Sequence, residues 1–281
     1  MWLAIAVGSA LLFGLAGWWM KVSQMRRGNV SVMLFGLYAS GTSGFGMHAA
    51  VEGTIHQLSD YRIWLAGIII GAGSALGNAL FMKALDYGPA ALTSPLTNMN
   101  IVLVIALGTL YYGEKLHYAE ATGIALLLAA VVLISYKKQS APSSVQSRWY
   151  LYVTAAILFF TFRNAGLKVT EELGLSSAPI LFIGYALSLI WFAIPLRKAS
   201  SSAAFRTGLK LGLLAGVFSY GGLQLYAVAL ATGPSNLAAP IFATNSLVVA
   251  AGSILVYKEK LNRAQWAAFI LTIAGLIIIR I

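Results

Sequence analysis

Long hydrophobic runs, separated by short polar segments, fill almost the whole chain. Ten of them approach the roughly 20 apolar residues that an α-helix needs to cross a lipid bilayer, so the pattern predicts an all-α membrane protein with ten transmembrane helices. Most connections are short, and consecutive helices are therefore expected to run antiparallel. The predicted spans are residues 2–20, 31–51, 62–85, 90–112, 117–136, 149–167, 178–196, 207–230, 235–257 and 264–280.

The clearest polar linker, KKQSAPSSVQSR at 137–148, lies near the middle of the chain and leaves five spans on each side. It predicts two halves: a first repeat over 1–138, a linker over 139–148 and a second repeat over 149–281.

The two halves are related in sequence. A shift of 145 residues aligns 77–134 with 222–279, and 20 of the 58 pairs are identical. Shared Ala and Leu are common in any membrane span, so the informative matches are those of Pro, Asn, Glu and Lys in one register. They are Gly88-Pro89 with Gly233-Pro234, Pro95 with Pro240, Asn100 with Asn245 and Glu114-Lys115 with Glu259-Lys260; at a shift of 147, Phe13 and Lys21 match Phe160 and Lys168.

An odd number of spans per half reverses the second copy in the bilayer. The sequence therefore predicts two inverted five-helix repeats, an arrangement in which secondary transporters hold substrate near the midplane and expose it alternately to either side.

Composition supports a lipid environment. Hydrophobic residues make up 59% of the chain and charged residues 10%, whereas soluble domains carry about 25% charged residues. With no Cys and three His at unrelated spacings, we expect no disulfide, metal site or cofactor. The apolar N-terminus lacks a basic leader and is predicted to remain as the first span.

The net charge of +11 is better explained by topology than by nucleic acid. If both termini lie outside, 14 of the 19 Lys and Arg fall on the cytoplasmic side, as the positive-inside rule requires. We therefore expect a multi-pass protein of a prokaryotic cytoplasmic membrane, and a monomer, because one chain contains both repeats.

Two motifs resemble a known family. The run ALDYGPAALTSPLTNMN leading to YYGEKL, and its echo ALATGPSNLAAPIFATNS leading to VYKEKL, are similar to the EamA-like branch of the drug/metabolite transporter superfamily. The resemblance implies a central cavity lined by the first four spans of each half, with the fifth span of each serving as scaffold.

Arg163 is the main candidate for substrate binding. It lies deep in the sixth span, where a buried guanidinium is costly, and its planar donors suit a carboxylate or phosphate. The structural alternatives are snorkelling to the interface or pairing with Glu52 or Glu171. Further candidates, chosen because they are polar or aromatic in central spans, are Asn164, Asn98, Asn78, Gln224, Trp18, Phe160, Tyr220 and Ser74.

A second set is expected at the contact between the repeats. Pro95 and Pro240 interrupt helical hydrogen bonding inside their spans, and Asn100 and Asn245 are expected to hydrogen-bond across the pseudo-two-fold axis. The alternative is that the freed carbonyls lie beside a polar cavity. Its donors and acceptors would then come from Thr97, Asn98, Asn100, Thr244 and Asn245.

The favoured function is a secondary transporter that moves a small polar metabolite, such as an amino-acid-like solute, most simply as an exporter. The chain has no phosphate-binding loop for ATP and no clustered acids, His or nucleophiles typical of an enzyme. Its aromatic residues fit organic cations or drugs as alternative substrates. A non-transporting membrane assembly protein is the alternative from another class.

Overall fold

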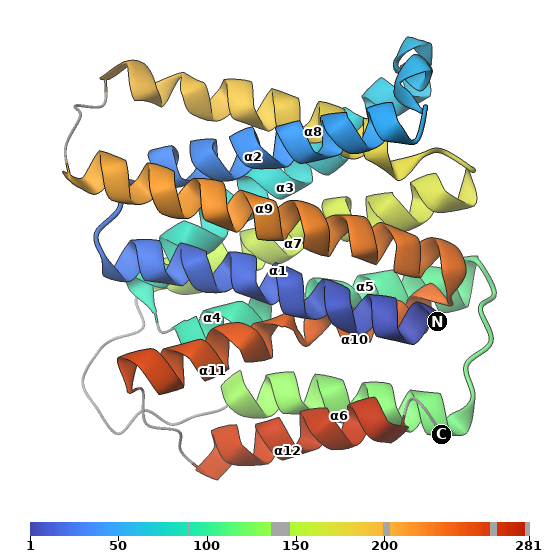
Figure 1. Cartoon of the computed structure of the whole chain (residues 1–281). Helices are drawn as coiled ribbons and strands as arrows, with labels where there is room; N and C mark the ends of the chain where they lie inside the picture. Colours follow the sequence, from blue (N-terminus) through green and yellow to red (C-terminus); the bar gives the residue numbers. More distant parts are fainter. Residues whose placement is uncertain (89, 136–146, 199–202, 259–262, 279–281) are drawn as a thin grey trace.

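A computed structural model describes residues 1–88, 90–135, 147–198, 203–258 and 263–278. These residues form long, roughly parallel helices joined by short loops (Figure 1). The elements are α1 (Trp2–Met25), α2 (Val30–Val51), η1 (Ile55–Ser59), α3 (Tyr61–Tyr87), α4 (Ala90–Thr97), α5 (Asn100–Ala106), η2 (Leu107–Tyr111), α6 (Tyr118–Ser135), α7 (Ser147–Glu172), α8 (Ser177–Ala193), η3 (Pro195–Lys198), α9 (Ala203–Thr232), α10 (Ser235–Ala243), α11 (Asn245–Tyr257) and α12 (Arg263–Ile278).

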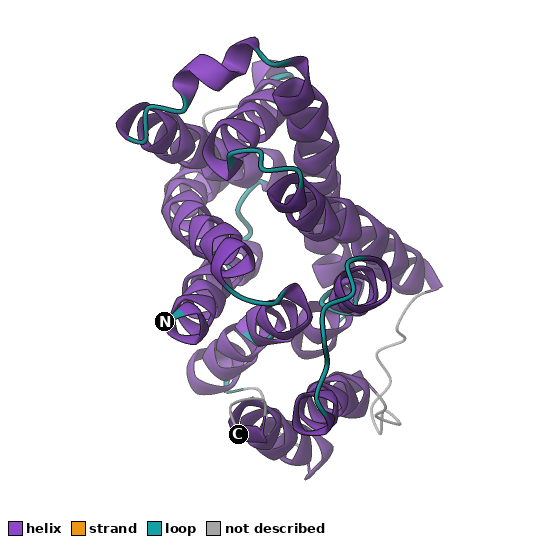
Figure 2. Cartoon of the chain, turned by 90° about the vertical axis from the view of Figure 1, so that its right-hand side faces the viewer, coloured by secondary structure: helices purple, strands orange, loops and turns teal. Residues whose placement is uncertain are grey.

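The described helices overlap the predicted spans. Four helical stretches within the described residues are long and apolar enough to cross a membrane: α1, α3, α9 and the run from Ser235 to Tyr257. Viewed along the helix axes, the helices form an elongated bundle (Figure 2). In this bundle α9 packs on α1 and α2, α3 packs on α7 and α8, and α6 pairs with α12 at one edge.

Two predicted spans, 90–112 and 235–257, are interrupted. The first divides into α4 and α5 with a break at Asn98 and Met99, and the second divides into α10 and α11 at Thr244. Each break follows its proline by three or four residues. At both breaks an asparagine side chain takes over a main-chain carbonyl: Asn100 Nδ2 donates to Thr97 O at 2.6 Å, and Asn245 Nδ2 donates to Phe242 O at 2.7 Å. Such local bonds compete with the helical ladder, so the asparagines stabilise the interruptions.

Small residues allow the closest helix contacts. A Cβ added to Gly212 of α9 would lie 2.2 Å from the main-chain oxygen of Met33 in α2. A Cβ added to Gly71 of α3 would lie 2.5 Å from the Cα of Gly184 in α8. Glycines at these crossings bring the backbones together, which is the usual basis of helix association in lipid.

The two halves of the sequence contribute matching contacts to the core. Tyr38 and Ser74 in the first half share a hydrogen bond of 3.1 Å between their hydroxyl groups, and Tyr185 and Ser219 in the second share one of 2.7 Å. Ser219 lies 145 residues after Ser74, and Tyr185 lies 147 residues after Tyr38. The register of the sequence repeat is therefore the register of these contacts.

Candidate functional site

A small cavity of about 40 Å³ lies among α1, α3, α4, α7 and α11, with α2 and α9 contributing one residue each. Its apolar wall includes Phe13, Met20 and Phe160. Its polar lining comprises Asn78, Ser94, Thr97, Asn98, Arg163, Ser219 and Asn245. A hydrophobic wall with a few placed polar groups is typical of a small-molecule site.

Arg163 is the charged side chain of this lining as far as the described residues go, and it is 3% exposed. Its guanidinium carbon lies 4.8 Å from the ring centroid of Phe13 and 4.6 Å from that of Phe160, which are cation–π distances. Its Nη1 atom has no hydrogen-bond partner among the described residues. The guanidinium therefore retains donor capacity beside the cavity.

The expected alternatives for Arg163 do not occur. Among the described residues, Glu171 pairs with Lys168, and Glu52 lies 2.9 Å from His48. Arg163 also does not reach an interface, since it is buried. A buried charge without an acidic partner is costly, and such a cost inside a membrane helix is typical of positions that serve function.

Asn164 positions Arg163 within a chain of buried amides. Arg163 Nε donates to Asn164 Oδ1 at 2.9 Å, and Asn164 Nδ2 donates to Asn100 Oδ1 at 2.7 Å. Asn100 donates in turn to the carbonyl of Thr97 at the break between α4 and α5. Arg163 is thus connected through Asn164 and Asn100 to the break between α4 and α5.

The two interrupted spans meet at their breaks. Asn98 Nδ2 donates to Ala243 O at 2.7 Å and to Asn245 Oδ1 at 3.2 Å. The contact between the halves therefore joins Asn98 to Asn245, whereas Asn100, expected to pair with Asn245, binds Asn164 instead. Pro240 lies inside α10 and is buried there, and Pro95 lies inside α4.

Asn78 also lines the cavity, and its amide donates to the Tyr38 hydroxyl at 2.9 Å. Ser74, one turn earlier, bonds to the same hydroxyl behind the cavity wall.

Three of the expected substrate residues lie away from this cavity. Trp18 packs against Tyr257, with ring centroids 5.5 Å apart. Tyr220 and Gln224 both contact His48, at 3.0 and 3.1 Å. Gln224 also lines a separate groove of about 590 Å³, between the ends of α2 and α7, the start of α8, and α9. Tyr220, Gln224 and His48 thus form a second polar cluster.

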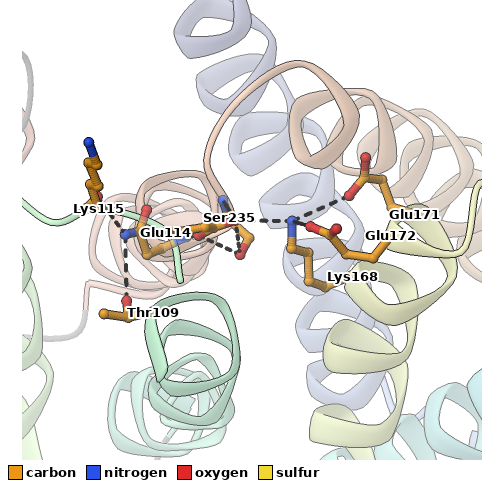
Figure 3. Close-up of polar contacts among 8 residues, drawn as sticks. Thr109, Glu114, Lys115, Lys168, Glu171, Glu172 and Ser235 are labelled. Carbon is orange, nitrogen blue, oxygen red and sulfur yellow. Dashed lines mark hydrogen bonds and ion pairs between the residues drawn. The ribbon is translucent and has the colours of Figure 1, made fainter. Parts of the chain in front are cut away.

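Glu114 and Lys168 form a charged cluster at one end of the cavity helices (Figure 3). Glu114 Oε1 lies 3.0 Å from Lys168 Nζ. The same carboxylate accepts hydrogen bonds from the main-chain N–H groups of Ser235 and Asn236 at 2.9 and 2.8 Å and from the Ser235 hydroxyl. Lys168 also pairs with Glu171 at 3.3 Å and with Glu172.

The environment of Glu114 favours its charged form. Burial alone raises the pKa of a carboxyl group, but the N–H groups of Ser235 and Asn236, together with Lys168 and the Ser235 hydroxyl, outweigh burial and hold the pKa of Glu114 below its usual value. The N-terminus of α10 adds the attraction of a helix dipole.

Sequence reasoning misses part of this geometry. It does not single out Ser94 and Ser219 as cavity residues, because hydroxyl residues are too common in membrane helices. Glu114 carries a usable signal, since it belongs to the Glu-Lys motif that both halves repeat. Its partner motif at Glu259-Lys260 lies outside the described residues.

The helices, the buried polar cavity and the apolar surface define a multi-pass membrane protein. The chain belongs to the EamA-like transporter family, whose model matches residues 1–136 and again residues 147–281. This family lies in the drug/metabolite transporter superfamily. The two matches correspond to the two halves of the chain.

Two curated relatives agree with this assignment. The chain is 32% identical over 74 residues to an uncharacterized transporter in the cobO 3' region of Sinorhizobium sp, a match covering 26% of this chain and 52% of the relative. It is 32% identical over 73 residues to the probable 4-amino-4-deoxy-L-arabinose-phosphoundecaprenol flippase subunit ArnE of Yersinia pestis, covering 26% of this chain and 62% of the relative. The chain thus spans only about half to three-fifths of the length of these relatives.

A solved protein structure shares the fold. It superposes with a TM-score of 0.70 at 16% sequence identity, over 99% of this chain and 95% of the other.

Proposed function

We propose that the protein is a secondary transporter that carries a small polar metabolite with an anionic head, such as an amino acid or another carboxylate, by alternating access. The observation that carries the proposal is Arg163, buried beside the cavity with Nη1 unpartnered among the described residues. A guanidinium forms paired hydrogen bonds with carboxylate and phosphate oxygens. An anionic substrate would supply the partner that the described residues lack.

The remaining lining suits the rest of such a molecule. The amides of Asn78 and Asn98 and the hydroxyls of Ser94 and Thr97 present donors and acceptors to polar groups. Phe13 and Phe160 provide apolar walls. The same groups accept a phosphate-bearing head, as borne by the cargo that the name of the flippase relative specifies, so phosphate is included in the test below.

Inverted repeats are part of the proposal. The family model matches both halves, and the paired contacts Tyr38–Ser74 and Tyr185–Ser219 support a symmetric arrangement. Five spans in each half would place the copies in opposite orientations, which is the arrangement that lets two halves rock around a shared site.

Orientation and direction complete the proposal. The charge distribution favours both termini outside the cytoplasmic membrane, and we infer export as the net direction and a monomer as the working unit.

Binding to the purified protein tests the substrate class. Thermal melting is measured with a panel of amino acids, dicarboxylates, inorganic phosphate and tetramethylammonium. A ligand that binds only the native state raises the melting temperature. An anion or zwitterion that raises it in the parent protein, but not in Arg163→Gln, supports the proposal, and uptake of that compound into proteoliposomes then measures transport. A response to tetramethylammonium that survives Arg163→Gln would refute it.

A further inference from the structure

Helix α10 links the charged cluster to the cavity. It is nine residues long, and Glu114 holds its first two main-chain N–H groups, on Ser235 and Asn236. Near its other end, Phe242 is 1% exposed, and its ring centroid lies 5.1 Å from that of Phe13, which lines the cavity. A movement of the first turn of α10 is therefore transmitted to the cavity wall.

Phe242 belongs to a stack of aromatic rings beside the cavity. Phe242 stacks on Tyr226 of α9 with ring centroids 4.2 Å apart, and Tyr226 is fully buried. Along α7, Lys168 lies five residues beyond Arg163, which at 1.5 Å per residue is about 7.5 Å. Seen from Arg163, the ion pair thus lies toward the C-terminal end of α7.

The cavity itself extends from Phe13 in the direction away from the charged cluster. Along α1 the cavity lining continues from Phe13 to Met20, and along α11 from Asn245 to Val249, toward the end of the bundle opposite the start of α1 (Figure 1). The loop that carries Glu114 and the start of α10 lie at the same end as the start of α1.

We propose that Glu114 and Lys168 form a gate latch that holds α10 in place and closes the cavity at this end of the protein. The inference rests on the proposed alternating access and adds the contact that must break for the cavity to open here. The hinge is the break at Thr244, where α10 ends and the chain is already free of regular helix.

Lys168 can release Glu114 without becoming an unpaired charge. Its ammonium group also contacts Glu171 and Glu172, three and four residues further along its own helix. Glu114 lies on a loop, at 13% side-chain exposure, and water can replace its partners when the loop moves. Opening therefore breaks one of three ion pairs of Lys168 and leaves the other two, which limits the free-energy cost of the open state.

The test uses the absence of cysteine from the chain. Ser94→Cys introduces a nearly isosteric thiol in the cavity lining, and a membrane-impermeant methanethiosulfonate reagent is added to right-side-out or inverted vesicles. Leu173→Cys, at a position 63% exposed beside the cluster, identifies the membrane face that carries the latch. No substrate is needed.

In the Ser94→Cys background, we expect Glu114→Gln and Lys168→Gln each to raise the labelling rate of the cavity thiol from the Leu173 face at least ten-fold, and to lower it from the opposite face. Lys21→Gln is the matched control. Lys21 is the repeat equivalent of Lys168 and is likewise buried, but it lies near the C-terminal end of α1, whereas the latch lies at the end of the bundle where α1 begins. It should leave labelling from the Leu173 face unchanged. Each variant is first checked for a single gel-filtration peak, and either latch variant suffices if the other fails to fold.

The outcomes separate this inference from the proposed function. If the cavity thiol is labelled from the opposite face and neither latch variant alters that labelling, the latch is overturned and alternating access still stands. A cavity thiol that reacts from neither face in any background would overturn both.

Discussion

The Nε atom of Arg163 donates to the side-chain oxygen of Asn164 at 2.9 Å, while Nη1 of the same guanidinium has no partner among the described residues. The arginine is thus fixed on one side and unsatisfied on another. Unpaired buried donors lower stability, and groups of this kind are typical of sites that sacrifice stability for binding.

Replacement of Arg163 by Met is expected to stabilise the unliganded protein. The substitution removes a buried charge that no described carboxylate neutralises and keeps an apolar side chain between neighbouring rings. Replacing a buried ion pair by apolar groups is neutral or stabilising by about 1–4 kcal/mol in known cases. For a lone buried charge we expect the gain at least to offset the loss of about 1–3 kcal/mol that follows when Asn164 Oδ1 loses its donor. The melting temperature of Arg163→Met, measured without ligand, should equal or exceed that of the parent.

The same variant should lose every ligand-induced shift that the parent shows with anions. Arg163→Lys serves as the comparison, since it retains the charge without the planar donors. A melting temperature many degrees below that of the parent would show that Arg163 is a structural residue.

The amide chain behind Arg163 is expected to act as a unit. Asn164 Nδ2 donates to Asn100 Oδ1 at 2.7 Å, and both side chains are buried, at 1% exposure each. Loss of one partner leaves a buried polar group unsatisfied, which costs about 1–3 kcal/mol. Asn164→Leu and Asn100→Leu should each destabilise the protein by that order, and the double variant by less than their sum.

A double-mutant cycle from denaturant or thermal unfolding measures the coupling. Thr161→Val, about one turn before Asn164 on the same helix, is the control, because its hydroxyl bonds to the main-chain oxygen of Ile157 in its own helix. Additive effects of the two leucine substitutions would mean that the Asn164–Asn100 bond contributes nothing.

The helical spans can be predicted because a lipid environment leaves few choices. Every main-chain polar group must bond within its own helix, so a run of about 20 apolar residues, such as 62–85, indicates a helix by length alone. For the interruptions at Asn98 and Thr244, the sequence predicts which spans are broken but not where. Proline indicates the correct spans, but the place of each break depends on asparagine side chains that find carbonyls only in the folded state.

The site is less accessible to sequence. Arg163, Asn98 and Asn78 stand out because polar groups are rare in apolar helices, and all three line the cavity. Trp18 and Tyr220 stand out by residue type alone, and type does not say which face of a helix a ring occupies. Glu114 reaches α10 across 121 residues of chain, a distance at which no local pattern predicts a contact.

Glu114 should make the stability of the protein depend on acid pH. The hydrogen bonds from α10 and Lys168 hold the pKa of Glu114 in the folded state below its ordinary value of 4.5. A lowered pKa contributes stability above the unfolded value, and this contribution is lost as the pH falls through the folded value. The parent should therefore melt at a higher temperature than Glu114→Gln near neutral pH, and the difference should shrink below pH 4.5.

Melting curves of both proteins from neutral pH down to about pH 3, below the unfolded pKa of a glutamate, test this. Asp60→Asn is the control, because Asp60 pairs with Arg62 on the surface and exposed ion pairs contribute little. A difference between parent and Glu114→Gln that stays constant down to the lowest pH would mean that the charge of Glu114 does not stabilise the fold.

Close contact between α2 and α9 is expected to forbid a side chain at Gly212. An added Cβ would lie 2.2 Å from the main-chain oxygen of Met33, and main chain cannot move aside as a flexible side chain can. Gly212→Ala should therefore separate the helices or prevent their association, and reduce the yield of monodisperse protein severalfold.

Gly8→Ala is the matched control on α1, since its Cβ would meet only the end of the Leu225 side chain at 3.4 Å. Alanine also favours helix by about 1 kcal/mol over glycine. Fluorescence-detected gel filtration of both variants measures the yield. Equal recovery of Gly212→Ala and Gly8→Ala would contradict the close packing of α2 on α9. The rigidity of the cavity would then have to come from other helix pairs.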